Sequence, residues 1–394
     1  MTITNTVYSF IIYVLFLAPT IVLTVFAERR LQSNKKVEFA ICSMFAIFVP
    51  CLLAAMRGEA VGTDIHVYAK HVYDLARATP SFESLLKMNT RFEPGYLAMA
   101  YISAHWFGSF NAMLFFTQLL IILPIYVSAF RVRDRIPAWS TMLCFYSFFY
   151  LMTFNIMREG ISVAFVLLSF VFMLDRKWIW AVLIAILGAM FHSSALLGFA
   201  LGLFVLLLVR VQNRRVKAVL ILAVVIAIPV MLKYWKDIFQ LLLALHVIPQ
   251  KYAFYIRRLT NSYLIGLNRD YLYKMILRCS AFFGAYFFLR KSPFFQNDRL
   301  GRFIQTGVFI GLLIYTGVLL IMKSGYGYRI SLYLEILLIF WVGGMARGVL
   351  GLNFKRMPLK LMVMIGIVVF WFMLAYIWRG MHGTMPFYFQ IYPY

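Results

Sequence analysis

Apolar stretches of roughly membrane-spanning length follow one another almost from end to end of this chain, separated by short basic loops. A transmembrane helix needs about 20 mainly apolar residues. With 63% hydrophobic and 13% charged residues and a mean hydropathy of +0.84, a water-soluble fold of 394 residues could not hide its own apolar surface. We therefore expect an all-α polytopic membrane bundle, forming a single integral-membrane domain over residues 1–394.

The apolar stretches predict about twelve transmembrane helices. They lie near residues 8–26, 38–55, 110–130, 138–154, 159–174, 178–191, 195–209, 217–234, 271–289, 303–322, 327–346 and 360–378. The segment 94–107 is apolar but short, so we expect a re-entrant or interfacial helix there. The alternative is a full crossing, which would invert every later loop.

The orientation follows from the basic loops, because Lys and Arg concentrate on the cytoplasmic side of a membrane. Placing Arg29 and Arg30 in the cytoplasm also places most other basic loops there, with both termini outside. Two long loops, 57–95 and 235–270, then lie on the extracytoplasmic side. The net charge of +24 sits in short loops without a stripe of interleaved aromatic residues, so we expect membrane lipid, and no nucleic acid, as its partner.

Three basic residues in short outward turns, Arg158, Lys323 and Arg329, run against this charge rule. Binding of an anionic ligand is one reason for such placement, because a guanidinium grips phosphate oxygens with paired donors. Snorkelling to lipid headgroups is the alternative. Further outward basic residues that could extend such a site are Arg57, Arg257 and Arg258.

Proton transfer could use His192, at the outward end of two apolar stretches, since imidazole titrates near neutral pH. A structural hydrogen bond is the alternative for a histidine in apolar surroundings. The outward carboxylates Asp64, Glu93 and Glu159 could act as a base or pair with a nearby arginine. Tyrosines that could stack on sugar rings are Tyr68, Tyr96, Tyr328 and Tyr333. The four cysteines lack the spacing of metal ligands, so no metal or cofactor is expected.

Several short motifs resemble the EpsG-like branch of the Wzy-type polysaccharide polymerases. Arg57 is followed by Gly62, Asp64 and Tyr68, and later by the run Phe92-Glu93-Pro94-Gly95-Tyr96. The similarity continues through Asn155-Ile156-Met157-Arg158, Phe191-His192-Ser193-Ser194, and Arg329 with Tyr333. Where the family often has Arg-Gln, this chain has Arg158-Glu159, which is a departure from the pattern.

The resemblance implies a bacterial inner-membrane glycosyltransferase of O-antigen, capsule or exopolysaccharide synthesis. Such an enzyme joins oligosaccharide repeat units carried on undecaprenyl pyrophosphate, at the periplasmic face and without a metal ion. Arg158 and Arg329 would bind the donor pyrophosphate with help from Arg57, and His192 would act as base or orient the acceptor, with Asp64 and Glu93 as reserves. A chain-length regulator protein is a further expected partner. An O-antigen ligase, a lipid-linked oligosaccharide flippase and a membrane acyltransferase are the alternatives.

Overall fold

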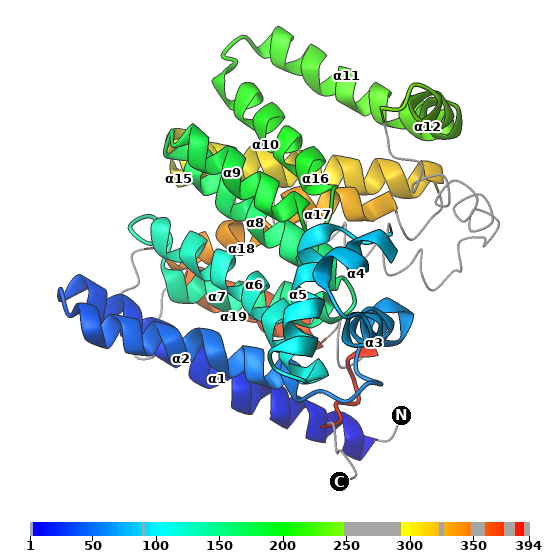
Figure 1. Ribbon diagram of the computed structural model, residues 1–394. Coiled ribbons are helices and arrows are strands. Elements are labelled where there is room, and N and C mark those ends of the chain that lie inside the picture. Colours follow the sequence, from blue (N-terminus) through cyan, green and yellow to red (C-terminus); the bar gives the residue numbers. More distant parts are fainter. Residues whose placement is uncertain are drawn as a thin grey trace. The chain divides into compact units, whose positions relative to one another are not determined.

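The structure is a computed structural model that describes residues 3–88, 91–247, 293–322, 327–347, 359–373 and 383–389 (Figure 1). Within these ranges the chain is helical and has no strand, which confirms the expected all-α class. One isolated bridge pairs the backbones of Arg57 and Phe389. Two compact units divide the chain, Met1–Leu196 with Leu338–Tyr394 (unit 1) and Leu197–Leu337 (unit 2).

Unit 1 opens with a long antiparallel pair, α1 (Ile3–Gln32) and α2 (Lys36–Ala55), which lie side by side along one edge of Figure 1. The predicted outward loop that follows is itself helical. It holds a turn of π-helix, η1 (Ile65–Ala69), then α3 (Lys70–Ala78) and α4 (Phe82–Met88). The short apolar segment predicted as re-entrant or interfacial becomes α5 (Pro94–His105), which begins with proline at a position that needs no backbone N–H.

The remaining helices of unit 1 lie close to the predicted apolar stretches. They are α6 (Phe110–Arg131), α7 (Ala138–Phe145), the π-turn η2 (Tyr146–Tyr150), the 3₁₀ turn η3 (Leu151–Phe154), α8 (Met157–Leu174), α9 (Trp178–Ala189), α18 (Leu338–Gly343), η6 (Gly344–Ala346) and α19 (Leu359–Phe372). Helix α8 packs against α6 and α9. Every residue of α8 is buried or half-buried, so α8 is a central helix of the unit.

Unit 2 is also helical where it is described. Helix α10 (Ala195–Arg210) leads into it from unit 1. Its further elements are α11 (Arg214–Lys233), α12 (Trp235–Ala244), α15 (Pro293–Asn297), α16 (Arg299–Met322), η5 (Gly327–Ser331) and α17 (Leu332–Glu335). Helix α16 packs against α11, η5 and α17.

Five helical segments in the described ranges are long and apolar enough to cross a membrane. They are Asn5–Gln32, Lys36–Ala55, Phe110–Arg131, Met157–Leu174 and Arg329–Ala346. Four shorter apolar segments, Ala138–Phe154, Trp178–Ala189, Ala195–Arg210 and Leu361–Phe372, add to them. The expected count of about twelve spans therefore stays a prediction, and so does the single domain. The predicted span 271–289 and most of the loop 235–270 lie outside the described residues.

Candidate active site

An ion pair between Glu93 and Arg158 joins the start of α5 to the first turn of α8. The Nη1 atom of Arg158 lies 2.7 Å from Oε2 of Glu93, and the two side chains are only 12% and 9% exposed. The other carboxylate oxygen, Oε1, accepts the backbone N–H of Ser193 at 3.3 Å. Because Glu93 binds both partners, three segments that are distant in sequence meet at one buried carboxylate.

Three aromatic rings surround the guanidinium of Arg158. Its Cζ atom lies 4.6 Å from the ring centre of Phe92, 5.0 Å from that of Tyr68 and 5.9 Å from that of Tyr96. The rings also contact one another, with centres 5.7 to 6.1 Å apart. Such contacts stabilise a cation through the negative faces of the rings. Arg158 is thus fixed in direction, and its positive charge is shared between Glu93 and the aromatic cage.

The carboxylate of Asp64 accepts a hydrogen bond from the backbone of the first turn of α8. Its carboxylate accepts the backbone N–H of Met157 at 3.0 Å and a short hydrogen bond from the hydroxyl of Tyr68. A carboxylate is favoured there by the positive end of the helix dipole. Burial raises the pKa of Tyr68 well above its usual value, and the charge of Asp64 adds to the effect. The phenol therefore stays protonated at neutral pH and donates to Asp64.

The guanidinium of Arg57, just beyond α2, is buried but has few polar contacts. The residue is 2% exposed, and its Cζ atom lies 4.0 Å from the ring centre of Phe154. Its Nη2 atom faces the sulfur of Met157 at 3.7 Å, and among the described residues its Nε atom has no hydrogen-bond partner. Burial lowers the pKa of Arg57 to about 10, against the pull of nearby groups that include Asp64, so the side chain stays charged at neutral pH. Buried charges are normally paired, so Arg57 is well suited to receive an anion.

A segment from the far end of the chain holds the Arg57 region in place. The backbone N–H of Gly58 donates to Tyr388 at 2.6 Å, and that of Gly62 donates to Gly383 at 3.0 Å. The same segment is tied to α1, because the hydroxyl of Tyr13 donates to the carbonyl of Thr384 at 2.6 Å. We call residues 383–389 the C-terminal strap. Its hydrogen bonds hold the backbone around Arg57 in position.

Gly62 and Gly95 permit close backbone contacts at this site. Gly62 has φ of +89°, and a Cβ atom there would lie 3.0 Å from the carbonyl oxygen of Phe154. Gly95 donates its N–H to Met190 at 2.8 Å, and an added Cβ would lie 2.7 Å from the same carbonyl oxygen. Only glycine allows these approaches without displacing the neighbouring backbone. The close contact at Gly62 thus brings Asp64 to the start of α8, and the contact at Gly95 brings Glu93 to the turn after α9.

His192 lies in that turn after α9, beside the segment that binds Glu93. Its Nδ1 atom makes a short hydrogen bond with the hydroxyl of Ser194, and its carbonyl accepts from Ser162 at 3.2 Å. The side chain is half-buried, unlike the fully buried carboxylates Asp64 and Glu93. Among the predicted proton acceptors of unit 1, His192 is the most accessible. Glu159 is buried in the first turn of α8, 4% exposed.

The predicted site residues of unit 2 are described only in part. Arg329 lies half-buried in η5. Tyr333 is completely buried, and its ring occupies the space beside Gly198, where a Cβ atom would lie 2.3 Å from Cδ1 of the tyrosine. Buried Glu335 accepts a short hydrogen bond from Ser331. Arg257, Arg258, Lys323 and the side chain of Tyr328 lie outside the described residues. A meeting of Arg329 with Arg158 and His192 stays a prediction.

The structure thus gathers most of the predicted residues of unit 1 into one cluster. Its charged members are two arginines and two carboxylates, Arg57, Arg158, Asp64 and Glu93, with Tyr68 and Tyr96 beside them and His192 next to the segment that binds Glu93. Glu159 is buried in the same turn of α8 as Arg158. Residues missed as site members are Phe92, which completes the cage, and the C-terminal strap. Phe92 stands inside a motif already singled out, whereas the strap carries no sequence signal that would place it beside Arg57.

Chemically, the cluster combines buried cations with groups that can hold or accept a proton. Arg57 can stabilise negative charge that develops on a leaving oxygen. The accessible imidazole of His192 can accept a proton from a hydroxyl group. These are the requirements of a transfer reaction in which an anionic group departs as a hydroxyl attacks.

Comparison with known proteins places the chain in a family. The model of the EpsG family matches residues 40–394, a range that contains the whole cluster. No curated protein and no solved structure matches the chain. The motifs of unit 1 that suggested the resemblance meet at the start of α8 and the turn after α9, whereas Arg329 and Tyr333 lie in unit 2. The family match confirms that resemblance, and the chain belongs to the EpsG family.

Proposed function

We propose that the protein is a polysaccharide polymerase. It joins oligosaccharide repeat units carried on undecaprenyl pyrophosphate, at the periplasmic face of the bacterial inner membrane. The observation that carries this proposal is the convergence of Arg57, Arg158 with Glu93, and the His192 turn in one cluster of unit 1. Membership in the EpsG family supports the same reaction class.

The reaction we propose is a glycosyl transfer between two lipid-linked glycans. A hydroxyl oxygen of the acceptor sugar forms a bond to the anomeric carbon of the donor glycan. The bond between that carbon and the pyrophosphate oxygen breaks, and undecaprenyl pyrophosphate departs with the electron pair. The hydroxyl proton passes to a base. Pyrophosphate is a capable leaving group, so the protein must mainly orient the substrates and stabilise the departing charge.

The contacts in the cluster suggest a division of roles. Arg57 binds the pyrophosphate, and Arg158 contributes its charge from the aromatic cage. His192 accepts the proton, since its imidazole is the most accessible of the proton acceptors predicted for this site in unit 1. Asp64 and Glu93 already accept hydrogen bonds from the protein, which suits positioning of α8 and of the His192 turn. Because guanidinium groups supply the stabilising charge, we expect the reaction to proceed in the presence of EDTA.

The test is polymerisation by purified protein supplied with synthetic undecaprenyl-pyrophosphate repeat units, with products resolved on a gel. We expect a ladder from the wild type, with or without EDTA, and none from His192→Ala or Arg57→Ala that retain the wild-type unfolding temperature. Asp74→Asn, which removes an exposed ion pair with Lys70 on α3, is the matched control and should leave the ladder unchanged.

The alternatives give different outcomes in the same assay. Folded wild-type protein that consumes intact substrate without a ladder, but transfers one glycan to a lipid A core acceptor, is a ligase. Protein that leaves the substrate chemically unchanged and moves it across a vesicle membrane is a flippase. Either result contradicts the polymerase proposal. A ladder that survives both substitutions would retain the function and remove these residues from the site.

A further inference from the structure

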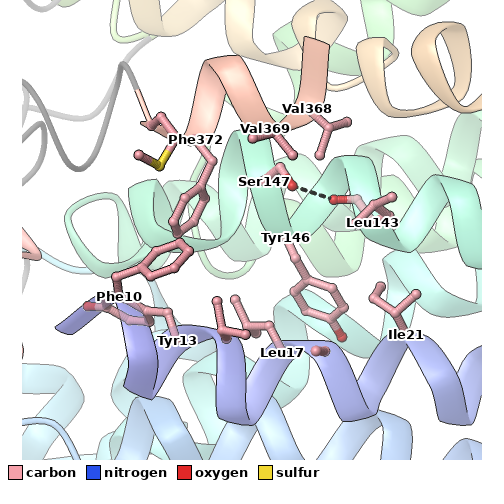
Figure 2. A pocket seen from close by; sticks show the side chains of 13 residues that line it. Phe10, Tyr13, Leu17, Ile21, Leu143, Tyr146, Ser147, Val368, Val369 and Phe372 are labelled. Carbon is pink, nitrogen blue, oxygen red and sulfur yellow. Dashed lines mark hydrogen bonds between the residues drawn. The ribbon is translucent and has the colours of Figure 1, made fainter. Parts of the chain in front are cut away.

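An apolar groove lies in unit 1 between α1, the junction of α7 with η2, and α19 (Figure 2). Its volume is about 240 Å³, and its walls include Phe10, Tyr13, Leu17, Tyr146 and Phe372. For comparison, an apolar cavity of about 150 Å³ is large enough to bind benzene. The serine in the wall, Ser147, donates to the carbonyl of Leu143 at 2.9 Å, so the groove presents mainly hydrocarbon and aromatic surface.

The groove opens toward the surroundings of a membrane-spanning helix. Val14 on α1 and Val369 on α19 both line it, and they are 42% and 53% exposed. The lining residues of α1 run from Phe10 to Ile21, about 16 Å at the rise of an α-helix. That length is about half of the hydrocarbon core of a bilayer. A hydrocarbon chain in the membrane can therefore enter the groove from the side.

A row of aromatic rings connects the groove with Arg57. Tyr146 in the groove wall contacts Tyr150 with ring centres 5.6 Å apart, and Tyr150 contacts Phe154 at 5.3 Å. The guanidinium of Arg57 lies over Phe154. On the opposite wall, Tyr13 binds the C-terminal strap, which pairs with the Arg57 backbone. Packed aromatic rings on one side, and Tyr13 with the C-terminal strap on the other, thus link the groove wall to the surroundings of Arg57.

This arrangement suits a lipid with one hydrocarbon chain and an anionic head. The groove is narrow and apolar, and the nearby buried cation is Arg57, whose Nε atom has no hydrogen-bond partner among the described residues. A phospholipid carries two acyl chains, whereas a polyprenyl phosphate carries one chain. We propose that the groove binds the isoprenoid tail of the lipid carrier next to its phosphate, which Arg57 holds. The inference rests on the proposed function, because that function supplies the polyprenyl substrate.

Filling the groove tests the proposal. Val14→Trp places an indole in the groove, and its matched control Leu15→Trp places one on the neighbouring exposed position, which does not line the groove. Val369→Trp and Phe370→Trp repeat the pair on α19, so that the test survives if one helix does not tolerate the change. Thermal unfolding selects the variants that fold.

The probes are undecaprenyl monophosphate and dioleoyl phosphatidic acid, with binding to detergent-purified protein followed by native mass spectrometry. We expect both groove variants to lose undecaprenyl phosphate affinity at least tenfold, while both controls and all phosphatidic acid affinities stay at the wild-type value. Wild-type binding by the groove variants overturns the proposal. Equal loss of both lipids also overturns it, because the groove would then be a general lipid site.

Polymerisation by the same proteins separates this inference from the proposed function. Groove variants that lose the lipid but polymerise at the wild-type rate contradict the proposed role of the groove and leave the proposed polymerase function intact. A wild-type protein that makes no polymer, yet shows the expected binding pattern, contradicts the polymerase function and supports the lipid-binding role of the groove.

Discussion

An ion pair beside an aromatic ring lies at each end of α8, but the surroundings of the two pairs differ. At its start, Arg158 pairs with Glu93 beneath three aromatic rings, and the side chains are 12% and 9% exposed. Beyond its last residue, Asp175 pairs with Arg131, which lies 4.1 Å from the ring centre of Phe172, with 41% and 28% exposure. Water screens the second pair and not the first. An ion pair over an aromatic ring therefore marks a functional site only where burial makes each charge depend on its partner.

The largest expected difference between the two ends is in stability. Arg158→Ala leaves the buried Glu93 carboxylate without its cation, which should cost about 3 kcal/mol or more. Arg131→Ala at the exposed end should cost less than about 1 kcal/mol. Thermal unfolding in detergent measures both. The double variant Glu93→Leu with Arg158→Leu should be less destabilised than Arg158→Ala, and equal losses at the two ends would refute the comparison.

Next in size is the effect of Arg57 on activity. Removing one charge that stabilises a departing oxygen typically lowers the rate by about 10² to 10³, so we expect this loss in the polymerisation rate of Arg57→Ala. Arg57→Lys should recover part of the activity because it keeps the charge. Arg91→Ala is the control, since Arg91 is an exposed arginine beside the aromatic ring of Phe92. A folded Arg57→Ala protein with the wild-type rate would show that the buried cation serves the fold alone.

A smaller effect extends the comparison to the starts of two helices. The N-terminus of α7 binds Glu28, whose Oε2 atom accepts the N–H groups of Ala138 and Trp139 at 3.1 and 3.4 Å. Glu28 and Asp64 are buried alike, 7% and 8% exposed. Glu28→Gln and Asp64→Asn should each cost about 1 kcal/mol of stability. Only Asp64→Asn should also slow polymerisation, because its carboxylate lies in the arginine cluster. Loss of activity in both variants would mean that helix capping alone explains the result.

The smallest expected effect concerns the hydroxyl of Tyr68. Tyr68→Phe keeps the ring beside Arg158 and removes the hydrogen bond to Asp64, at a cost of about 1 kcal/mol. Burial raises the pKa of Tyr68 above its unfolded value, so this contribution should be constant at neutral pH and decrease above pH of about 10, where only the unfolded phenol ionises. Unfolding temperatures of both proteins between pH 7 and 11 measure it. A stability difference that grows with pH would contradict the assignment.

The positions of the helices can be predicted from the sequence better than the contacts between side chains. Apolar length alone places α2, α6 and α8 within a few residues, because a helix satisfies its own backbone and needs only local information. The partner of Glu93 was not predictable in this way. Arg91 is closer in sequence, yet the ion pair forms with Arg158, because the extended backbone at Glu93 and the tight contact of Gly95 with Met190 direct the carboxylate elsewhere.

The C-terminal strap has a consequence for the order in which the protein is made. Its residues pair with Gly58 and Gly62 and bind Tyr13 and Ser9 of α1, so the two sides of each contact are more than 300 residues apart. During synthesis, α1 and Arg57 enter the membrane long before residue 389 leaves the ribosome. The surroundings of the buried arginine are therefore completed last, and a chain that stops short of the strap carries all of its arginines without an assembled site.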